Sequence, residues 1–152
     1  MAEHLEQQAV VEWYRWQYPK LQNYLFAIPN GAALCDISGK KRNARLKYLF
    51  DEGFRSGVSD LFLALPAAQY HGLWLEMKDN HKKIESLSLN QTEFILDMRA
   101  AGFAAAWAAG SAQAIAALQK YMALRNCGGK ALRELTITNR KSDYDQISNS
   151  SD

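Results

Sequence analysis

Residues 60–78 read DLFLALPAAQYHGLWLEMK, in which two short apolar runs are separated by a proline and a brief connection. The first run occupies residues 60–65 and ends at Pro66, and the second occupies residues 72–78. Short apolar runs between turn residues are typical of buried strands. The stretch therefore predicts two neighbouring strands that form a hairpin.

Two carboxylates interrupt these apolar runs. Asp60 opens the first strand, and Glu76 stands near the end of the second, two positions before Lys78. Because successive side chains of a strand point to opposite faces, Glu76 and Lys78 emerge on the same face. In a hairpin, the start of the first strand meets the end of the second. We therefore expect Asp60, Glu76 and Lys78 to form one cluster at one edge of the sheet.

This cluster has the composition of a metal site. Two neighbouring acids are costly unless a cation or a shared proton compensates them, and Mg²⁺ binds such oxygen ligands while it retains several waters. At a phosphodiester, the ion would polarise the phosphoryl oxygen and activate a bound water, and Lys78 would orient that water or neutralise developing charge. The alternative is structural, since an acid at a strand start is often a turn or cap residue and a Glu-x-Lys pair is often a solvated ion pair.

Helical and strand patterns alternate around the hairpin. Apolar residues at helical spacing predict helices over residues 5–18, 39–53, 88–101 and 111–124. Further strands are expected at residues 23–28 and 103–107. Ser88 and Gln91 form a capping-box sequence, and Ser111 is expected to cap the last helix. The element order is α, β, α, β, β, α, β, α, which indicates an α/β fold.

The length and composition fit one domain. The 152 residues are 48% hydrophobic, enough for a core, and the formal net charge of +2 says little about a polyanionic partner. We expect a globular domain at residues 1–124 and a polar, loosely ordered tail at residues 125–152, with a short strand at residues 135–138.

The chain shows no signal-like stretch and no run long enough to span a bilayer, and its two cysteines lack metal-ligand spacing. We therefore expect a soluble cytoplasmic protein of phage or bacterial type, associated with the nucleoid when on DNA. Neither an organic cofactor nor a membrane partner is expected.

Four motifs together resemble a known family. They are Pro29-Asn30-Gly31, residues 53–61 (GFRSGVSDL), residues 75–78 (LEMK), and residues 87–91 (LSLNQ) followed by Gly102. On these motifs, residues 6–124 resemble the virus-type replication-repair nuclease (VRR-NUC) domains of the PD-(D/E)xK nuclease superfamily. The resemblance implies a restriction-endonuclease-like α/β fold, with a central mixed β-sheet flanked by helices.

The same resemblance implies roles for individual residues. Asp60 and Glu76 would be metal ligands for Mg²⁺ or Mn²⁺, the Met77 carbonyl would add a third ligand, and Lys78 would be the catalytic lysine. Ser59 stands where the family usually has proline. This departure removes a backbone constraint but no ligand.

The family also places a catalytic glutamate on the first helix. Glu6 lies about 50° from the middle of the apolar stripe of this helix, whereas Glu3 lies about twice as far away. We therefore expect Glu6 to serve the site. Glu12, about 70° off on the other side, is its competitor, and a solvated helix carboxylate is the alternative. Gln91 is a further catalytic candidate, although the capping box alone explains it.

Basic residues on two segments are candidate nucleic-acid contacts. In the helix at residues 39–53, Leu46, Leu49 and Phe50 are expected to face inward and the basic residues largely outward. The candidate phosphate contacts are Lys40, Lys41, Arg42 and Arg45 on this helix and Lys82 and Lys83 on the loop after the second strand. The alternative is an ordinary solvated helix face.

The predicted function is metal-dependent hydrolysis of DNA by a structure-specific endonuclease. Free-standing members of the family look like dimeric Holliday-junction resolvases, whereas fused members resemble flap nucleases, and this short chain favours the former. A homodimer on branched DNA is expected, because the first helix carries more aromatic surface than one core-facing stripe can bury, with Trp13, Tyr14, Trp16 and Tyr18. The alternatives are a flap nuclease, a less selective nuclease or nickase, and a non-catalytic nucleic-acid-binding module.

Overall fold

The computed structural model describes residues 2–29 and 39–126, and the side chains of residues 2, 39–43 and 126 lie outside this description. The strand expected at residues 135–138 and both cysteines fall outside it as well. Among the helices described, none has both the length and the apolar character needed to cross a membrane.

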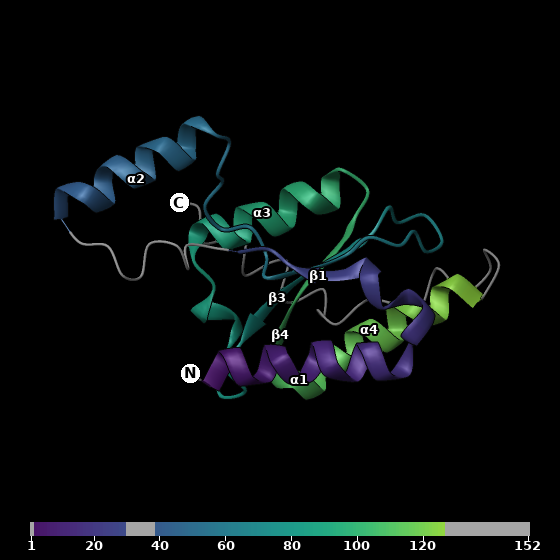
Figure 1. The fold of residues 1–152 in the computed structure, drawn as a ribbon. Coiled ribbons are helices and arrows are strands. Elements are labelled where there is room, and N and C mark those ends of the chain that lie inside the picture. Colours follow the sequence, from purple (N-terminus) through teal and green to yellow (C-terminus); the bar gives the residue numbers. More distant parts are fainter. Residues whose placement is uncertain (1, 30–38, 127–152) are drawn as a thin grey trace.

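A four-stranded mixed sheet forms the centre of the fold (Figure 1). Its strands are β1 (Leu25–Ala27), β2 (Leu61–Leu63), β3 (Leu73–Lys78) and β4 (Ala104–Ala109), in the spatial order β1-β2-β3-β4. β2 pairs antiparallel with both β1 and β3, whereas β4 runs parallel to β3. The predicted hairpin and the predicted mixed sheet are confirmed, with Leu61 opposite Leu75.

Helices flank this sheet on both faces. The described chain forms α1 (Ala2–Gln17), α2 (Gly39–Asp51), α3 (Leu89–Ala100) and α4 (Gly110–Asn126), with the short 3-10 helices η1 (Pro19–Tyr24) and η3 (Ile84–Ser86). α1 and α4 contact each other below the sheet in Figure 1, and α3 lies above it. The predicted α/β architecture is therefore present.

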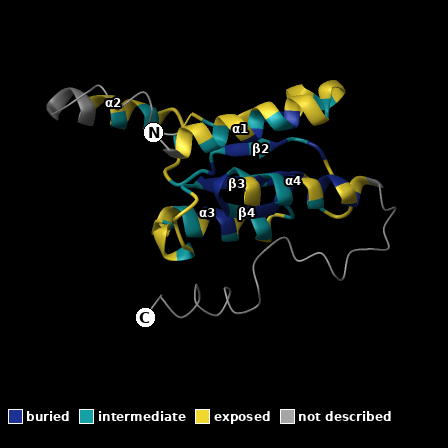
Figure 2. Cartoon of the chain, turned by 90° about the horizontal axis from the view of Figure 1, so that it is seen from below, coloured by how far each residue is buried: buried dark blue, intermediate teal, exposed yellow. Residues whose placement is uncertain are grey.

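The alternation of side chains along β3 separates the core from the site. Leu73, Leu75 and Met77 are buried in the main core, where the helices contribute Val10, Tyr14, Ala114, Ala117, Leu118 and Tyr121 (Figure 2). Trp74 and Glu76 alternate with these residues and meet α3 instead. The Trp74 ring contacts the Phe94 ring of α3 edge to face, with centroids 5.1 Å apart.

Two strands differ in extent from their sequence-based expectations. The strand expected at residues 23–28 is shortened to β1, because Pro19 opens the 3-10 helix η1 in front of it. The strand expected at residues 103–107 is β4 instead, since its parallel pairing with β3 continues as far as Lys78 opposite Ala109. Alanine has a low strand propensity, so pairing and burial hold this segment extended.

The start of α4 also differs from expectation. The helix begins at Gly110, so Ser111 lies inside its first turn and the expectation that Ser111 is the N-cap is wrong. The Ser111 N–H donates a hydrogen bond to Glu6 Oε2 on α1 (2.7 Å). A carboxylate from another helix thus satisfies one of the free N–H groups at this helix start.

Helix α2 extends away from the rest of the fold (Figure 1). The expectation that Phe50 faces inward is wrong, because its side chain is 53% exposed and its ring meets the nearby Phe54 ring, at 5.5 Å between centroids. Leu46 and Leu49 are half-buried. The linker that follows α2, rather than the helix itself, packs against α3.

Candidate active site

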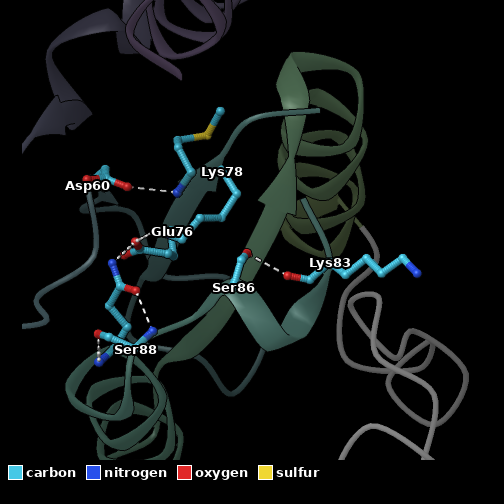
Figure 3. A network of polar contacts seen from close by, with 8 residues as sticks. Asp60, Glu76, Lys78, Lys83, Ser86 and Ser88 are labelled. Carbon is cyan, nitrogen blue, oxygen red and sulfur yellow. Dashed lines mark hydrogen bonds and ion pairs between the residues drawn. The ribbon is translucent and has the colours of Figure 1, made fainter. Parts of the chain in front are cut away.

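The hairpin brings Asp60 and Glu76 to the same edge of the sheet. Asp60 directly precedes β2, and Glu76 follows Leu75, which pairs with Leu61. The Met77 N–H donates a hydrogen bond to Asp60 Oδ2 (2.8 Å; Figure 3). The first carboxylate is therefore tied to the strand that carries the second.

Glu76 is the polar centre of this edge. Its side chain is 1% exposed, and its Oε1 accepts hydrogen bonds from Lys78 Nζ (2.9 Å) and from Gln91 Nε2 (Figure 3). Its other oxygen, Oε2, is buried and has no hydrogen-bond partner among the described residues. A buried carboxylate oxygen without a donor is costly, so it is a natural position for a cation.

The local electrostatics favour protonation of both carboxyl groups. Burial raises the pKa of Glu76 to about 7, and the neighbouring Asp60 adds to this rise, whereas Lys78 opposes it. Burial also raises the pKa of Asp60, against the effects of the Met77 N–H and the Lys78 ammonium. Two acids that resist ionisation at the same place need a positive charge to ionise together.

Lys78 supplies one such charge. Its side chain is only 11% exposed, and it lies on the same face of β3 as Glu76. The Glu-x-Lys pair is therefore buried, and the alternative of a solvated surface ion pair does not describe it. One ammonium faces two carboxyl groups, so the cluster has room for further positive charge.

Gln91 both caps α3 and contacts the site. The capping box with Ser88 is complete: Gln91 N–H donates to Ser88 Oγ (3.3 Å), and Ser88 N–H donates to Gln91 Oε1 (2.9 Å). Because the amide oxygen is occupied by this N–H, the amide nitrogen is directed to Glu76 Oε1. The two interpretations of Gln91 are thus compatible.

The described contacts of Glu6 are with the start of α4 and not with Asp60 or Glu76. Glu6 lies at the start of α4, where hydrogen bonds from the Ser111 side chain and N–H lower its pKa. Glu3, in the first turn of the same helix, adds only a small share to the raised pKa of Asp60 and of Glu76, after burial and the nearer groups.

The helical angle that favoured Glu6 over Glu3 reports which side of a helix faces the core. It does not report which end of the helix lies at the site. The competitor Glu12 accepts a hydrogen bond from Gln8 on the same helix (3.0 Å) and is exposed. No described contact joins Glu12 to Asp60 or Glu76.

The candidate nucleic-acid contacts lie on two segments. Arg45 on α2 is exposed and lies over the Tyr48 ring, 5.7 Å from its centroid. Lys82 and Lys83 are exposed on the loop after β3, where the Lys83 carbonyl accepts a hydrogen bond from Ser86 Oγ (2.6 Å; Figure 3). The backbone of Lys40, Lys41 and Arg42 belongs to α2, but their side chains lie outside the described residues.

The donor atoms at this edge fit a hard divalent cation. Within the described residues, no group of three or more His, Cys, Asp or Glu side chains is arranged to hold a metal. The site instead offers two carboxylates, one of them with a free buried oxygen, and the main chain of β3. An all-oxygen set with few protein ligands suits Mg²⁺, which keeps several of its waters.

Comparisons with known proteins place this fold in a family. A family model described as the VRR-NUC domain matches residues 1–112. A solved structure described as a VRR_NUC domain protein is 26% identical in sequence, with a TM-score of 0.63. The similarity covers 82% of this chain and 90% of that one. None of the curated proteins compared with this chain matches it.

Proposed function

This chain belongs to the VRR-NUC family of nuclease domains, and from this membership we propose that it is a metal-dependent DNA endonuclease with its centre at Asp60, Glu76 and Lys78. The observation that carries the proposal is the geometry of Glu76. Its carboxylate is fully buried, is held through Oε1 by two donors, and keeps Oε2 without a described partner beside a second acid. Burial of a carboxylate oxygen without a donor is costly, and a cation bound there would offset this cost.

Asp60, Glu76 and the Met77 carbonyl would hold the ion, Mg²⁺ or Mn²⁺. When bound, such an ion polarises a phosphoryl oxygen and lowers the pKa of a coordinated water. A bound cation would favour the ionised form of both carboxyl groups, and so displace the proton that burial favours on Glu76, whose pKa is about 7. Metal binding should therefore release protons near neutral pH.

Lys78 and Gln91 would contribute in different ways. The Lys78 ammonium stands within hydrogen-bond distance of Glu76 and is directed to the charged edge of the sheet. There it would orient the attacking water or stabilise charge that develops on the phosphate. Gln91 would hold Glu76 through Oε1, and so leave Oε2 for the cation.

The proposed substrate is branched DNA, cut by a homodimer in the manner of a Holliday-junction resolvase. Exposed Arg45, Lys82 and Lys83 support contact with phosphates on either side of the site. On α1, the Trp16 side chain is 88% exposed, which supports an interface on this helix. A flap nuclease or a less selective nickase would use the same chemistry on another substrate.

A substrate panel tests the proposal. The wild-type protein should cut four-way junctions faster than flap, nicked or linear DNA, in the presence of Mg²⁺ or Mn²⁺ and not in chelator. Light scattering at micromolar concentration should give the mass of a dimer. A monomer that cuts flaps and leaves junctions intact would contradict the resolvase proposal. DNA binding without cleavage under any metal condition would instead indicate a non-catalytic binding module.

A further inference from the structure

The linker between α2 and β2 passes closest to the backbone of α3 at Gly57. Gly57 adopts a left-handed backbone conformation (φ +83°), and a side-chain Cβ at this position would lie 2.5 Å from the Asn90 carbonyl oxygen and 2.7 Å from Asn90 Cβ. Atoms cannot approach so closely without a shift of backbone. Only glycine therefore permits the observed contact between the linker and α3.

Two neighbouring contacts hold the linker against the same helix. Asn90 Nδ2 donates a hydrogen bond to Ser56 Oγ (3.0 Å). Arg55 pairs with Asp97 two turns further along α3 (2.5 Å), and its guanidinium lies over the Phe94 ring. The linker thus contacts α3 at three successive positions of its own chain, Arg55, Ser56 and Gly57.

The contact at Asn90 adjoins the residue that reaches the site. Gln91 follows Asn90 directly, its amide oxygen is held by the Ser88 N–H, and its amide nitrogen donates to Glu76. A shift of this turn away from the linker would carry Gln91 with it, because the capping box fixes the side chain relative to the helix. The position of the first turn of α3 therefore decides whether Gln91 meets Glu76.

We infer that Gly57 is a positioning residue for the active site, which sets the first turn of α3 at the position where Gln91 holds Glu76. Its effect on cleavage rests on the proposed function, whereas its effect on the Gln91–Glu76 hydrogen bond does not. The nearest atoms to a Cβ at Gly57 all belong to Asn90, so the inferred effect runs through α3.

The chain provides a matched control in Gly53. This residue is also left-handed (φ +90°), but a Cβ there would meet nothing within 4 Å. Gly53→Ala and Gly57→Ala therefore share the backbone strain of a left-handed alanine, and only Gly57→Ala adds a collision with α3. A difference between the two variants isolates the packing of Gly57 on Asn90.

The first readout is the side-chain amide of Gln91, observed by NMR without added metal and identified by its loss in Gln91→Ala. In Gly57→Ala, this resonance should move toward its position in Glu76→Ala, where its acceptor is missing. Gly53→Ala should leave it in place. A folded Gly57→Ala with an unchanged Gln91 resonance would overturn the inference.

Should Gly57→Ala fail to fold, Ser56→Ala supplies the same test without backbone strain, since it removes the acceptor for Asn90. A smaller displacement of the Gln91 resonance in the same direction is expected. No displacement in Ser56→Ala would overturn the inference equally.

The second readout is cleavage. Gly57→Ala and Gln91→Ala should each slow cleavage by roughly 10- to 100-fold, the size expected for a group misplaced by about 1 Å. The double variant should be no slower than the slower single variant, because both changes remove the same contact. Losses that multiply would show that Gly57 acts elsewhere and overturn the inference. If the wild-type protein cuts no DNA, the proposed function fails, and the amide resonance still decides the role of Gly57.

Discussion

Lys78 Nζ lies 2.9 Å from Glu76 Oε1, and solvent reaches only 11% and 1% of the two side chains. An exposed ion pair adds little to stability, and a buried one has a desolvation cost that its attraction barely offsets. A second acid, Asp60, makes this location less favourable still for ionised Glu76. The pair is therefore poorly explained by stability, and it supports the proposal of a catalytic centre.

The pH dependence of stability should reveal the burial of Glu76. Its pKa in the folded protein is about 7, above the ordinary value of 4.5, so the folded state retains a proton that the unfolded state loses between these values. The resulting stability is fully present below pH 4.5 and is lost as pH rises through about 7. In chelator, the free energy of unfolding should fall by up to roughly 3 kcal/mol over this window. Urea unfolding at stepped pH measures it.

Glu76→Gln is the control for that measurement, since glutamine has similar volume and does not ionise. The fall in stability should be much smaller in this variant. The raised pKa of Asp60 also makes the free energy of unfolding fall as pH rises, so part of this pH dependence should persist in Glu76→Gln. If the free energy of unfolding depended equally on pH in the two proteins, Glu76 would ionise normally in the folded state.

Lys78→Ala should slow cleavage by about 100-fold or more, because it removes a positioned charge from the reacting edge. Metal binding should persist, since the two carboxylates remain, and calorimetric titration with Mn²⁺ would establish this. Lys20→Ala, which removes an exposed lysine of η1 outside the candidate nucleic-acid contacts, is the control and should retain most activity. Near-normal turnover in Lys78→Ala would leave the lysine with only a structural role.

Glu6→Ala should lower the melting temperature while cleavage is largely retained, because Glu6 caps α4 and does not contact the two carboxyl groups. Its pKa is lowered in the folded state, so its contribution is present at neutral pH and is lost as pH falls through the folded value. The melting temperatures of Glu6→Ala and wild type should therefore converge in acid. Glu12→Ala removes another α1 carboxylate and should change neither property. Loss of cleavage without loss of stability in Glu6→Ala would restore Glu6 to the site.

Ser59→Ala should stabilise the protein by about 1 kcal/mol and leave cleavage unchanged, because a buried hydroxyl without a partner is costly. The Ser59 side chain is fully buried, and its Oγ has no hydrogen-bond partner among the described residues. Ser56→Ala is the comparison, since the Ser56 hydroxyl accepts a hydrogen bond from Asn90 and its removal should not stabilise. Chemical unfolding of the three proteins in parallel gives the two differences. A loss of stability in Ser59→Ala would show that its hydroxyl has a partner.

Local patterns were sufficient to predict the parts of the fold that depend on near neighbours in sequence. The hairpin follows from two apolar runs around Pro66, and strand alternation then places Glu76 and Lys78 on one face. The capping box needs only Ser88 and Gln91, three positions apart. These features are decided within a few residues, which is why the sequence alone predicts them.

Features that depend on distant segments were not predictable in the same way. The alanine segment of β4 extends to Ala109 because β3 continues beside it. Glu6 meets Ser111 at the start of α4 because of how α1 lies against that helix in space. The role of Gly57 depends on its contact with Asn90, 33 positions away by their residue numbers. No periodicity in the sequence reports such contacts.

The most direct measurement is cleavage of a labelled four-way junction by wild type, Asp60→Asn, Glu76→Gln and Glu12→Gln across a titration of Mg²⁺, with DNA binding measured in parallel. Wild type and Glu12→Gln should cut in proportion to metal occupancy. Asp60→Asn and Glu76→Gln should bind DNA normally and lose cleavage by about 100-fold or more, since each lacks a charged ligand of the ion. Cleavage at the wild-type rate by either of these two variants, or by wild type in chelator, would contradict a metal centre at Asp60 and Glu76.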